Sequence, residues 1–137
     1  LEIGRYLDQS PLRSLITLDG RDLGKAISCE NLTKLIKPIS ITQSAGVIRE
    51  LRPKLVAALA ELDKRAEAHA KHLQETAQAT AESSLHAEAH RLRSLGERNG
   101  SVRDDEVLAV EQLLTETTEA VLRAEPRLQG IRVVVAT

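Results

Sequence analysis

Aromatic residues are almost absent from this 137-residue sequence, which has no tryptophan or phenylalanine and a single tyrosine, Tyr6. Its basic residues therefore lack the interleaved rings on which the bases of single-stranded nucleic acid stack. Cysteine is equally scarce, because Cys29 is the only one. One thiol cannot form an intramolecular disulfide or a cysteine-based zinc site. We interpret Cys29 as an inert thiol in a reducing compartment, with a reactive cysteine as the alternative.

Long apolar runs and a strong net charge are also missing. No run approaches the roughly 20 apolar residues that span a bilayer, and the start has no signal-peptide pattern, so we expect a soluble, cytoplasmic protein. The 19 Lys and Arg residues nearly balance the 20 Asp and Glu residues. Counted along the sequence the charges are mixed, and no third of the chain forms a basic arm for nucleic acid or an anionic membrane. We expect one domain, residues 1–137, cut from a longer protein.

The strongest periodic signal runs from about Gln43 to Leu95. Apolar residues recur there at steps of three and four, and the stretch is rich in Ala, Glu, Lys and Leu, which favour helix. The main apolar positions are Leu51, Leu55, Ala58, Leu62, Ala66, Leu73, Ala77, Ala81, Leu85, Ala89 and Leu92. An unbroken helix of about 45 residues would be roughly 68 Å long. We therefore expect it either to project from the body or to bend in the segment TAQATAESS.

The segment RNGSVRDDEV separates this helix from a second one. Gly96 and the pair Asn99-Gly100 predict the end of the first helix and a turn. Ser101 is a candidate N-cap for the second helix. Apolar residues at helical spacing then continue until Pro126 closes the helix. We expect the two helices to lie antiparallel.

Three consecutive acids, Asp104, Asp105 and Glu106, stand at the start of this second helix. Carboxylates in a first turn interact favourably with the positive end of the helix dipole. A metal-binding cluster is the alternative, but three carboxylates within one turn fan around the helix instead of converging. We therefore interpret the acidic run as part of the helix start.

The remainder of the chain predicts a short helix and a small sheet. Asp19-Gly20 stands between two apolar runs, which favours a β-hairpin turn. Helical spacing over 32–36, followed by Pro38, predicts one or two turns of helix. The β-branched ending IRVVVAT predicts a strand that pairs with residues 15–18. The predicted fold class is therefore α+β, a long antiparallel helical hairpin packed on a small antiparallel sheet that includes the N-terminal hairpin and the C-terminal strand.

Four histidines on the long predicted helix are the best candidates for metal ligands. His86 and His90 are one turn apart, but the sequence HAEAH has its glutamate one position too late for the H-E-x-x-H motif of zinc proteases. His69 and His72 would lie roughly 21 to 26 Å from His86, and farther from His90, along a straight helix. The two pairs cannot share one ion, so we predict solvated or half-buried histidines and no metal site.

Two segments resemble nucleotide-binding motifs only in part. In GRDLGKA, residues 20–26, three residues separate the glycines where a P-loop has four, and Ala26 cannot ligate magnesium. RDDEVL opens a predicted helix, whereas the acidic box of an ATPase follows a buried strand. No serine stands in a G-x-S-x-G elbow. We predict no catalytic residue and no bound cofactor in this chain.

Several arginines flank the predicted junction between the two long helices: Arg91, Arg93, Arg98 and Arg103. They could contact phosphate or an acidic partner. Acids are interleaved with them and aromatic residues are missing, so we interpret them as a solvated surface. Arg98, Arg103 and Arg132 are the exposed candidates for a first alanine substitution.

Three segments in this order resemble the C-terminal domain of the RapA family, the bacterial RNA polymerase-associated ATPases of the SWI/SNF type. They are SPLRSLITLDGRDLGKAI, LRSLGERNGSVRDDEV and RLQGIRVVVAT, and together they span essentially the whole chain. The most specific residues are Asn99, Val102, Arg103, Asp104, Asp105 and Glu106, then Arg127, Leu128, Ile131, Arg132 and Val133. Gly100 departs from the proline expected after Asn99, and the long helix is richer in alanine than expected.

The resemblance implies a parent that binds core RNA polymerase, hydrolyses ATP with two RecA-like lobes that move on nucleic acid, and recycles polymerase from stalled or post-termination complexes. Family residues for ATP, magnesium and DNA would lie upstream of Leu1, so none is assigned here. The implied partners are core RNA polymerase and the motor domains of the same chain, within the cytoplasmic transcription machinery. The domain itself would be a non-catalytic accessory for docking or regulation.

Two other functions remain open from the residues alone. The first is a free-standing interaction module in which residues 51–95 form an intermolecular coiled coil. A dimer that depends on concentration would favour it. The second is a small metal-dependent hydrolase that uses His86 and His90, which metal retained through purification would favour.

Overall fold

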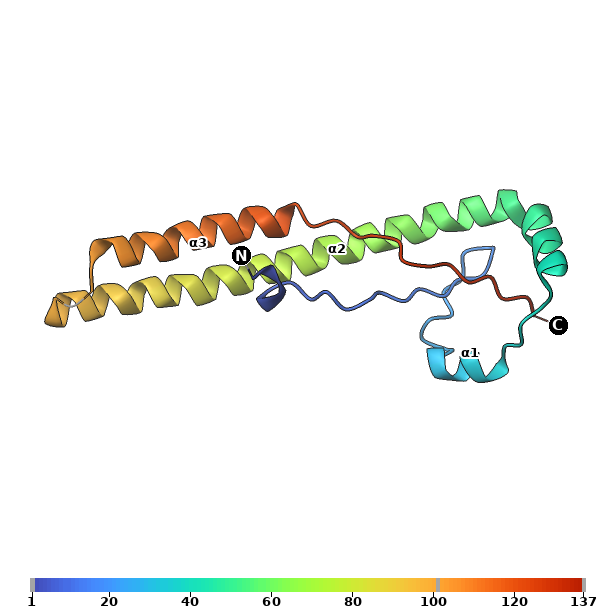
Figure 1. Cartoon of the computed structure of the whole chain (residues 1–137), viewed down its shortest axis with the longest axis horizontal. Helices are drawn as coiled ribbons and strands as arrows, with labels where there is room; N and C mark the ends of the chain where they lie inside the picture. The colour runs from blue at the N-terminus through green and yellow to red at the C-terminus, as the bar shows by residue number, and fades with distance from the viewer. Residues whose placement is uncertain (1, 101, 137) are drawn as a thin grey trace. The chain divides into compact units, whose positions relative to one another are not determined.

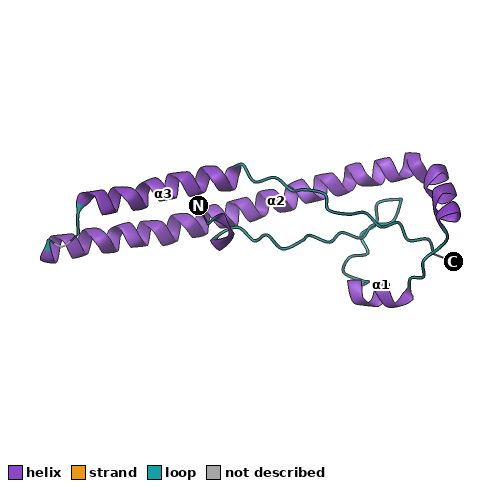
Figure 2. Cartoon of the chain, in the orientation of Figure 1, coloured by secondary structure: helices purple, strands orange, loops and turns teal. Residues whose placement is uncertain are grey.

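The computed structural model describes residues 2–100 and 102–136, which form helices joined by loops. Figure 1 shows the elements in chain order: the 3-10 helix η1 (Ile3–Arg5) and the α-helices α1 (Cys29–Leu35), α2 (Ile41–Asn99) and α3 (Asp104–Leu122). Among the described residues there is no β-strand, and Figure 2 accordingly contains only helix and loop. The predicted α+β class is therefore wrong, because the sheet on which it depended does not form.

The spacing of apolar residues correctly predicts the long helix α2. The segment TAQATAESS, residues 76–84, is helical throughout. The helix changes direction instead in its first turns (Figure 1), and Pro53 lies in that part of α2. Proline lacks a backbone N–H and its ring clashes with the preceding turn, so it bends a helix.

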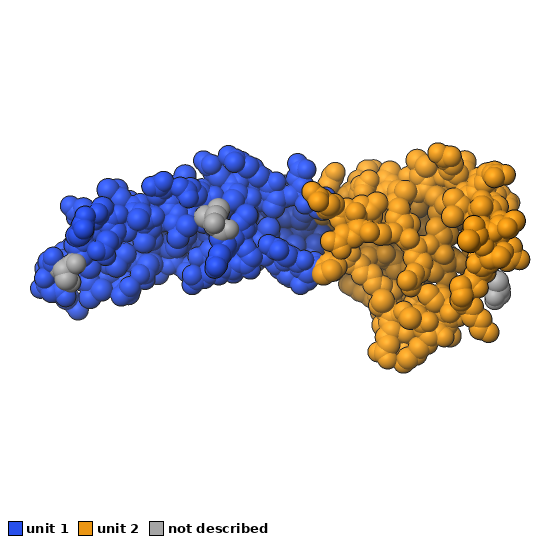
Figure 3. Space-filling view, viewed as in Figure 1, with its two compact units in different colours: residues 1–10, 68–126 blue, residues 11–67, 127–137 orange. Residues whose placement is uncertain are grey.

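Two compact units divide the chain, as the colours of Figure 3 show. Unit 1 consists of residues 1–10 and 68–126, and unit 2 of residues 11–67 and 127–137. The boundary falls inside α2, so this helix contributes to both units. The single domain expected over residues 1–137 stays a prediction. Within the described ranges no helix is both long and apolar enough to cross a membrane.

Unit 1 is built on α3, which runs antiparallel to the C-terminal part of α2. Near one end of the pair, Gln74 Nε2 donates to the Ala124 carbonyl at 2.7 Å, and farther along Arg93 pairs with Glu111. All buried residues of the described chain lie in this unit: Ala77, Ala81, Leu85, Ala89, Thr117 and Val121. Within each helix they repeat every four residues, which places them on one face. The core of unit 1 is therefore one stripe on each helix, and mostly alanine on α2.

The connection from α2 to α3 follows the predicted turn. α2 ends at Asn99, and Gly100 adopts a φ of 60°, the left-handed conformation that favours glycine after a helix. The Gly100 N–H donates to the carbonyl of Gly96 at 2.9 Å. The predicted N-cap, Ser101, lies outside the described residues. Arg103 occupies the N-cap position of α3, and its side chain makes no capping hydrogen bond.

The short helix α1 confirms the helix expected before Pro38, although it begins three residues earlier than the apolar spacing indicated. Ser28 explains the earlier start, because its hydroxyl oxygen accepts a hydrogen bond from the Asn31 N–H at 3.1 Å. Sequence spacing therefore located this helix, and the capping residue set its first turn.

Unit 2 contains the turn predicted at Asp19-Gly20 but not the strands beside it. Gly20 has a φ of 88°, which requires the freedom of glycine. Antiparallel pairing is limited to one bridge, between Ile16 and Asp22. No residue of unit 2 that the structure describes is buried. The turn is thus a local element and not the edge of a core.

Residues 127–136 form no strand, so their predicted pairing with residues 15–18 is wrong. A strand needs a neighbour whose backbone groups are still free. The Leu15 carbonyl already accepts from the Leu23 N–H at 2.8 Å, and the Thr17 N–H donates to the Arg21 carbonyl at 2.9 Å. The turn therefore pairs with itself, and no described residue forms a backbone hydrogen bond with residues 127–136, so the β-branched ending stays exposed.

Candidate functional site

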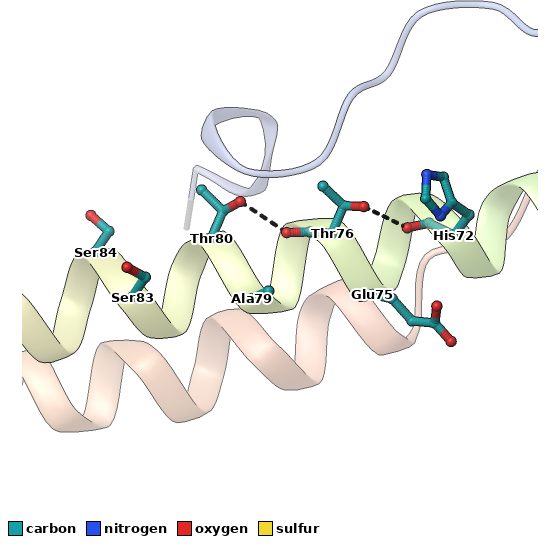
Figure 4. A pocket seen from close by; sticks show the side chains of 7 residues that line it. All are labelled: His72, Glu75, Thr76, Ala79, Thr80, Ser83 and Ser84. Carbon is teal, nitrogen blue, oxygen red and sulfur yellow. Dashed lines mark hydrogen bonds between the residues drawn. The ribbon is translucent and has the colours of Figure 1, made fainter.

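A depression of about 690 Å³ lies along α2 in unit 1, lined by His72, Glu75, Thr76, Ala79, Thr80, Ser83 and Ser84. Figure 4 shows that all seven side chains come from this one helix. The hydroxyls of Thr76 and Thr80 donate to the carbonyls of His72 and Thr76, each at 2.9 Å. Side chains of a single helix diverge from its axis. The lining residues therefore do not bring a nucleophile, a base and an acid together.

The four histidines lie on α2 in unit 1. His86 and His90 are exposed and one turn apart, His69 is half-buried, and His72 lines the depression of Figure 4. In the described ranges, no three side chains among His, Cys, Asp and Glu are placed to hold a metal ion together. His86 and His90 alone would supply two ligands, fewer than the three or four protein ligands of zinc sites.

The three acids after the interhelical turn occupy the first turn of α3, which confirms their position at a helix start. Asp104, Asp105 and Glu106 are all exposed. Arg103 Nη2 lies 2.7 Å from Asp105 Oδ2. The acidic run therefore interacts with the helix dipole and a neighbouring arginine.

The arginines at the helix junction differ in their partners. Arg91 binds Glu88 at 2.6 Å, and Arg93 pairs with Glu111 across the two helices. The hydrogen bond from Arg91 lowers the pKa of Glu88, and the same bond raises the pKa of Arg91. Arg98 is exposed and makes no ion pair with a described residue. Of the three arginines first chosen for alanine substitution, Arg103 binds an acid, whereas Arg98 and Arg132 form no ion pair with any residue that the structure describes.

The segment 20–26 forms a turn and does not fit the phosphates of ATP. A phosphate loop directs its backbone N–H groups toward the ligand. Here the N–H of Gly24 donates to Asp22 Oδ1 at 2.8 Å, so a carboxylate occupies the place where a phosphate oxygen would bind. Cys29, shortly after this segment, is exposed at the start of α1.

Asp19 stabilises the same turn. The Thr17 hydroxyl donates to its carboxylate, and Arg21 Nε lies 3.1 Å from the other carboxylate oxygen. The hydrogen bond from Thr17 is the main reason why the pKa of Asp19 lies below its ordinary value, while desolvation acts in the opposite direction. This shift belongs to turn formation, since all the groups involved are within two residues of Asp19.

Two side chains with structural roles were missed by the sequence analysis. Arg65 Nη1 lies 3.0 Å from Asp22 Oδ2, its Nη2 donates to the Gly20 carbonyl at 3.2 Å, and its Nε donates to Glu61 at 3.2 Å. Arg65 thus attaches the turn of unit 2 to α2. Gln74 plays a comparable role in unit 1 by binding the carbonyl of Ala124 after α3. Both residues are polar and lie on the mainly apolar face of α2, which was the only indication in the sequence. That indication does not show which residue each of them binds.

The described residues define a class of protein: a mainly helical chain whose lining and titratable residues form no catalytic constellation and no metal cluster among the described positions. Over residues 1–136 the sequence matches the family described as "RNA polymerase recycling family C-terminal". The chain therefore belongs to this family, as the three quoted segments indicated.

Curated relatives agree with this assignment. The chain is 29% identical over 136 residues to the RNA polymerase-associated protein RapA of Pasteurella multocida, and 33% identical over 136 residues to that of Histophilus somni. A third relative is RapA of Photobacterium profundum, 25% identical over 135 residues. These matches cover 98 to 99% of this chain. The chain spans about 14% of the length of each of these relatives.

Proposed function

We propose that this chain is the docking domain of a larger ATP-dependent, helicase-like protein that recycles RNA polymerase and so stimulates transcription. The family match over residues 1–136 carries the proposal. The relatives' printed name, RNA polymerase-associated protein, supports RNA polymerase as the partner, and we propose that the chain binds its core form. The setting is the cytoplasmic transcription machinery.

Catalysis is assigned to the remainder of the parent and not to this chain. The relatives are about seven times longer than the segment matched here, which leaves ample sequence for two motor lobes that bind ATP, magnesium and nucleic acid. Segment 20–26 supports this division, because its glycine spacing and the Asp22 carboxylate are incompatible with phosphate binding. The chain would act by holding the motor and the polymerase together.

The first experiment is a pull-down of purified core RNA polymerase by three proteins. These are this chain, the full-length parent, and the parent truncated before Leu1. Binding by the chain, together with weaker binding by the truncated parent, supports docking. No binding by the chain, with a truncated parent that still binds but has an altered ATPase rate, contradicts docking and makes the domain a regulator of the motor.

A further inference from the structure

The two units carry opposite net charges, although the sequence as a whole is balanced. Unit 1 contains 7 Lys and Arg residues against 13 Asp and Glu, a net charge of −6. Unit 2 contains 12 against 7, a net charge of +5. Residues 11–67 contribute 10 of these basic residues and all 7 acids of unit 2, and residues 127–137 add two basic residues and no acid. Unit 2 is therefore a basic surface within a nearly neutral protein.

Most of the bases in unit 2 are not neutralised inside it. Ion pairs occupy Arg21, Lys34 and Arg65, whose partners are acids of the same unit. The other nine bases are exposed and form no ion pair with a residue that the structure describes; they are Arg13, Lys25, Lys37, Arg49, Arg52, Lys54, Lys64, Arg127 and Arg132. Their charge is thus available to an external partner.

Unit 2 also exposes most of the large aliphatic side chains that the described chain leaves in water. Three of the fifteen belong to unit 1, and twelve belong to unit 2: Leu12, Leu18, Leu35, Ile39, Ile41, Ile48, Val56, Leu128, Ile131, Val133, Val134 and Val135. Leu35 and Ile41 are 77% and 88% exposed. Burial of these side chains against a partner would be favourable.

The basic and aliphatic properties meet on one face of α2. Arg49, Arg52 and Val56 follow one another at steps of three and four residues, which places them on the same side of the helix. All three are exposed, and Val56 has 59% of its surface in water. A partner that covers this face must therefore supply both negative charge and apolar surface.

We propose that unit 2 docks on an acidic protein surface of RNA polymerase that also exposes aliphatic side chains; this inference rests on the proposed function. Nucleic acid is the weaker candidate for two reasons. Unit 2 has no aromatic residue on which bases could stack, because Tyr6 belongs to unit 1. The phosphates of a nucleic acid would bind the basic side chains but would leave the twelve aliphatic side chains in water. An acidic protein surface with apolar residues would bind the basic side chains and also cover the aliphatic ones.

The test uses two variants of the 137-residue chain, and each variant reverses two charges within one unit. The unit 2 variant is Arg49→Glu with Arg52→Glu, and the matched control is Lys71→Glu with Arg98→Glu in unit 1. All four residues are exposed on α2 and have no ion pair with a described residue. Circular dichroism at 222 nm establishes that both variants keep the helix content of the original chain. Binding to purified core RNA polymerase and to a 20-base-pair DNA duplex is then measured at several NaCl concentrations.

We expect the unit 2 variant to bind core polymerase about tenfold more weakly at low salt and to show a flatter salt dependence, while the control changes by less than about twofold. Equal losses in both variants, or none in the unit 2 variant, overturn the inference. An unchanged affinity for polymerase with lost affinity for the duplex also overturns it and identifies a nucleic-acid surface. In each of these cases the original chain still binds polymerase; if it does not, the proposed docking function itself is wrong.

Discussion

Unit 1 and unit 2 share the helix α2 but are held together by different forces. In unit 1, α2 packs against α3 and buries Ala77, Ala81, Leu85, Ala89, Thr117 and Val121. In unit 2 the described residues bury no side chain, and the visible connections are polar, chiefly those of Arg65. The comparison teaches that a residue can be helical without being buried. The helix α2 is continuous, but its described side chains are buried only in unit 1.

The energetic consequence is that stability and recognition are separated along α2. Burial of apolar surface is the dominant favourable contribution to folding, and it is concentrated in unit 1. Unit 2 keeps its aliphatic and basic side chains in water, where a partner can reach them. Each of the following predictions can break or sharpen this division.

The largest effect is expected from truncating a leucine in unit 1. Leu85 is 7% exposed, so Leu85→Ala should lower the free energy of unfolding by about 2 to 5 kcal/mol through lost burial and a residual cavity. Leu35→Ala is the same chemical change in unit 2, where the side chain is 77% exposed, and should alter stability by less than about 0.5 kcal/mol. Urea unfolding followed by circular dichroism measures both. Similar losses for the two variants would show that unit 2 has a core of its own.

An intermediate effect is expected from removing the arginine that attaches the turn to α2. Arg65→Met keeps an unbranched apolar stem but removes the guanidinium and its bonds to Asp22, Gly20 and Glu61. Because the Arg65 side chain is 30% exposed, water replaces part of these interactions, and the local loss should be about 1 kcal/mol. Hydrogen exchange of the Thr17 and Leu23 amides should become roughly fivefold faster.

The matched control for this variant is Arg52→Met, which removes an exposed arginine without an ion pair to any described residue. Exchange at the same two amides should stay at its original rate. If Arg65→Met also leaves the exchange rate unchanged, unit 2 is stabilised by something other than these polar contacts, and the comparison between the units fails.

The smallest effect concerns pH. The pKa of Asp19 is lowered mainly by the Thr17 hydroxyl, so the folded turn favours the charged carboxylate. Its contribution is present above the ordinary pKa of 3.8 and is lost as the pH falls through the lowered pKa. Asp19→Asn should therefore speed exchange of the Arg21 amide near neutral pH, and the difference from the original chain should disappear only when the pH falls below the lowered pKa of Asp19.

Glu88→Gln in unit 1 serves as the comparison, since Arg91 lowers the pKa of Glu88 in a similar way. It should leave the turn of unit 2 unaffected at every pH. An Asp19→Asn effect that persists with the same size below the pKa would mean that charge on Asp19 does not matter to the turn.

The helices could be predicted from the sequence because their signals are local. Apolar spacing, alanine content and the Asn99-Gly100 turn depend on neighbours within a few residues, and they gave α2 and α3. The sheet could not be judged in this way. Whether Ile131 and its β-branched neighbours become a strand depends on a partner far away in the sequence, and no described residue forms a backbone hydrogen bond with residues 127–136. Residues with a high β propensity form a strand only when a second strand is available to pair with them.

The surface features were predicted less well than the helices. The sequence correctly placed Asp104, Asp105 and Glu106 in a first helical turn, since capping is also local. It did not predict the pairing of Arg65 with Asp22, 43 residues apart. Nor did it find the basic character of unit 2, because the boundaries of the units, near residues 10, 67 and 126, are known only from the folded chain.

The discontinuous composition of the units also sets an order of assembly. Unit 1 has all its residues once the chain has been synthesised to residue 126, whereas unit 2 requires the last eleven residues as well. Since domains begin to fold as the chain leaves the ribosome, the buried helix pair can form while the basic surface is still incomplete. A product that stops at residue 126 would therefore contain the whole helix pair and lack part of the surface proposed for docking.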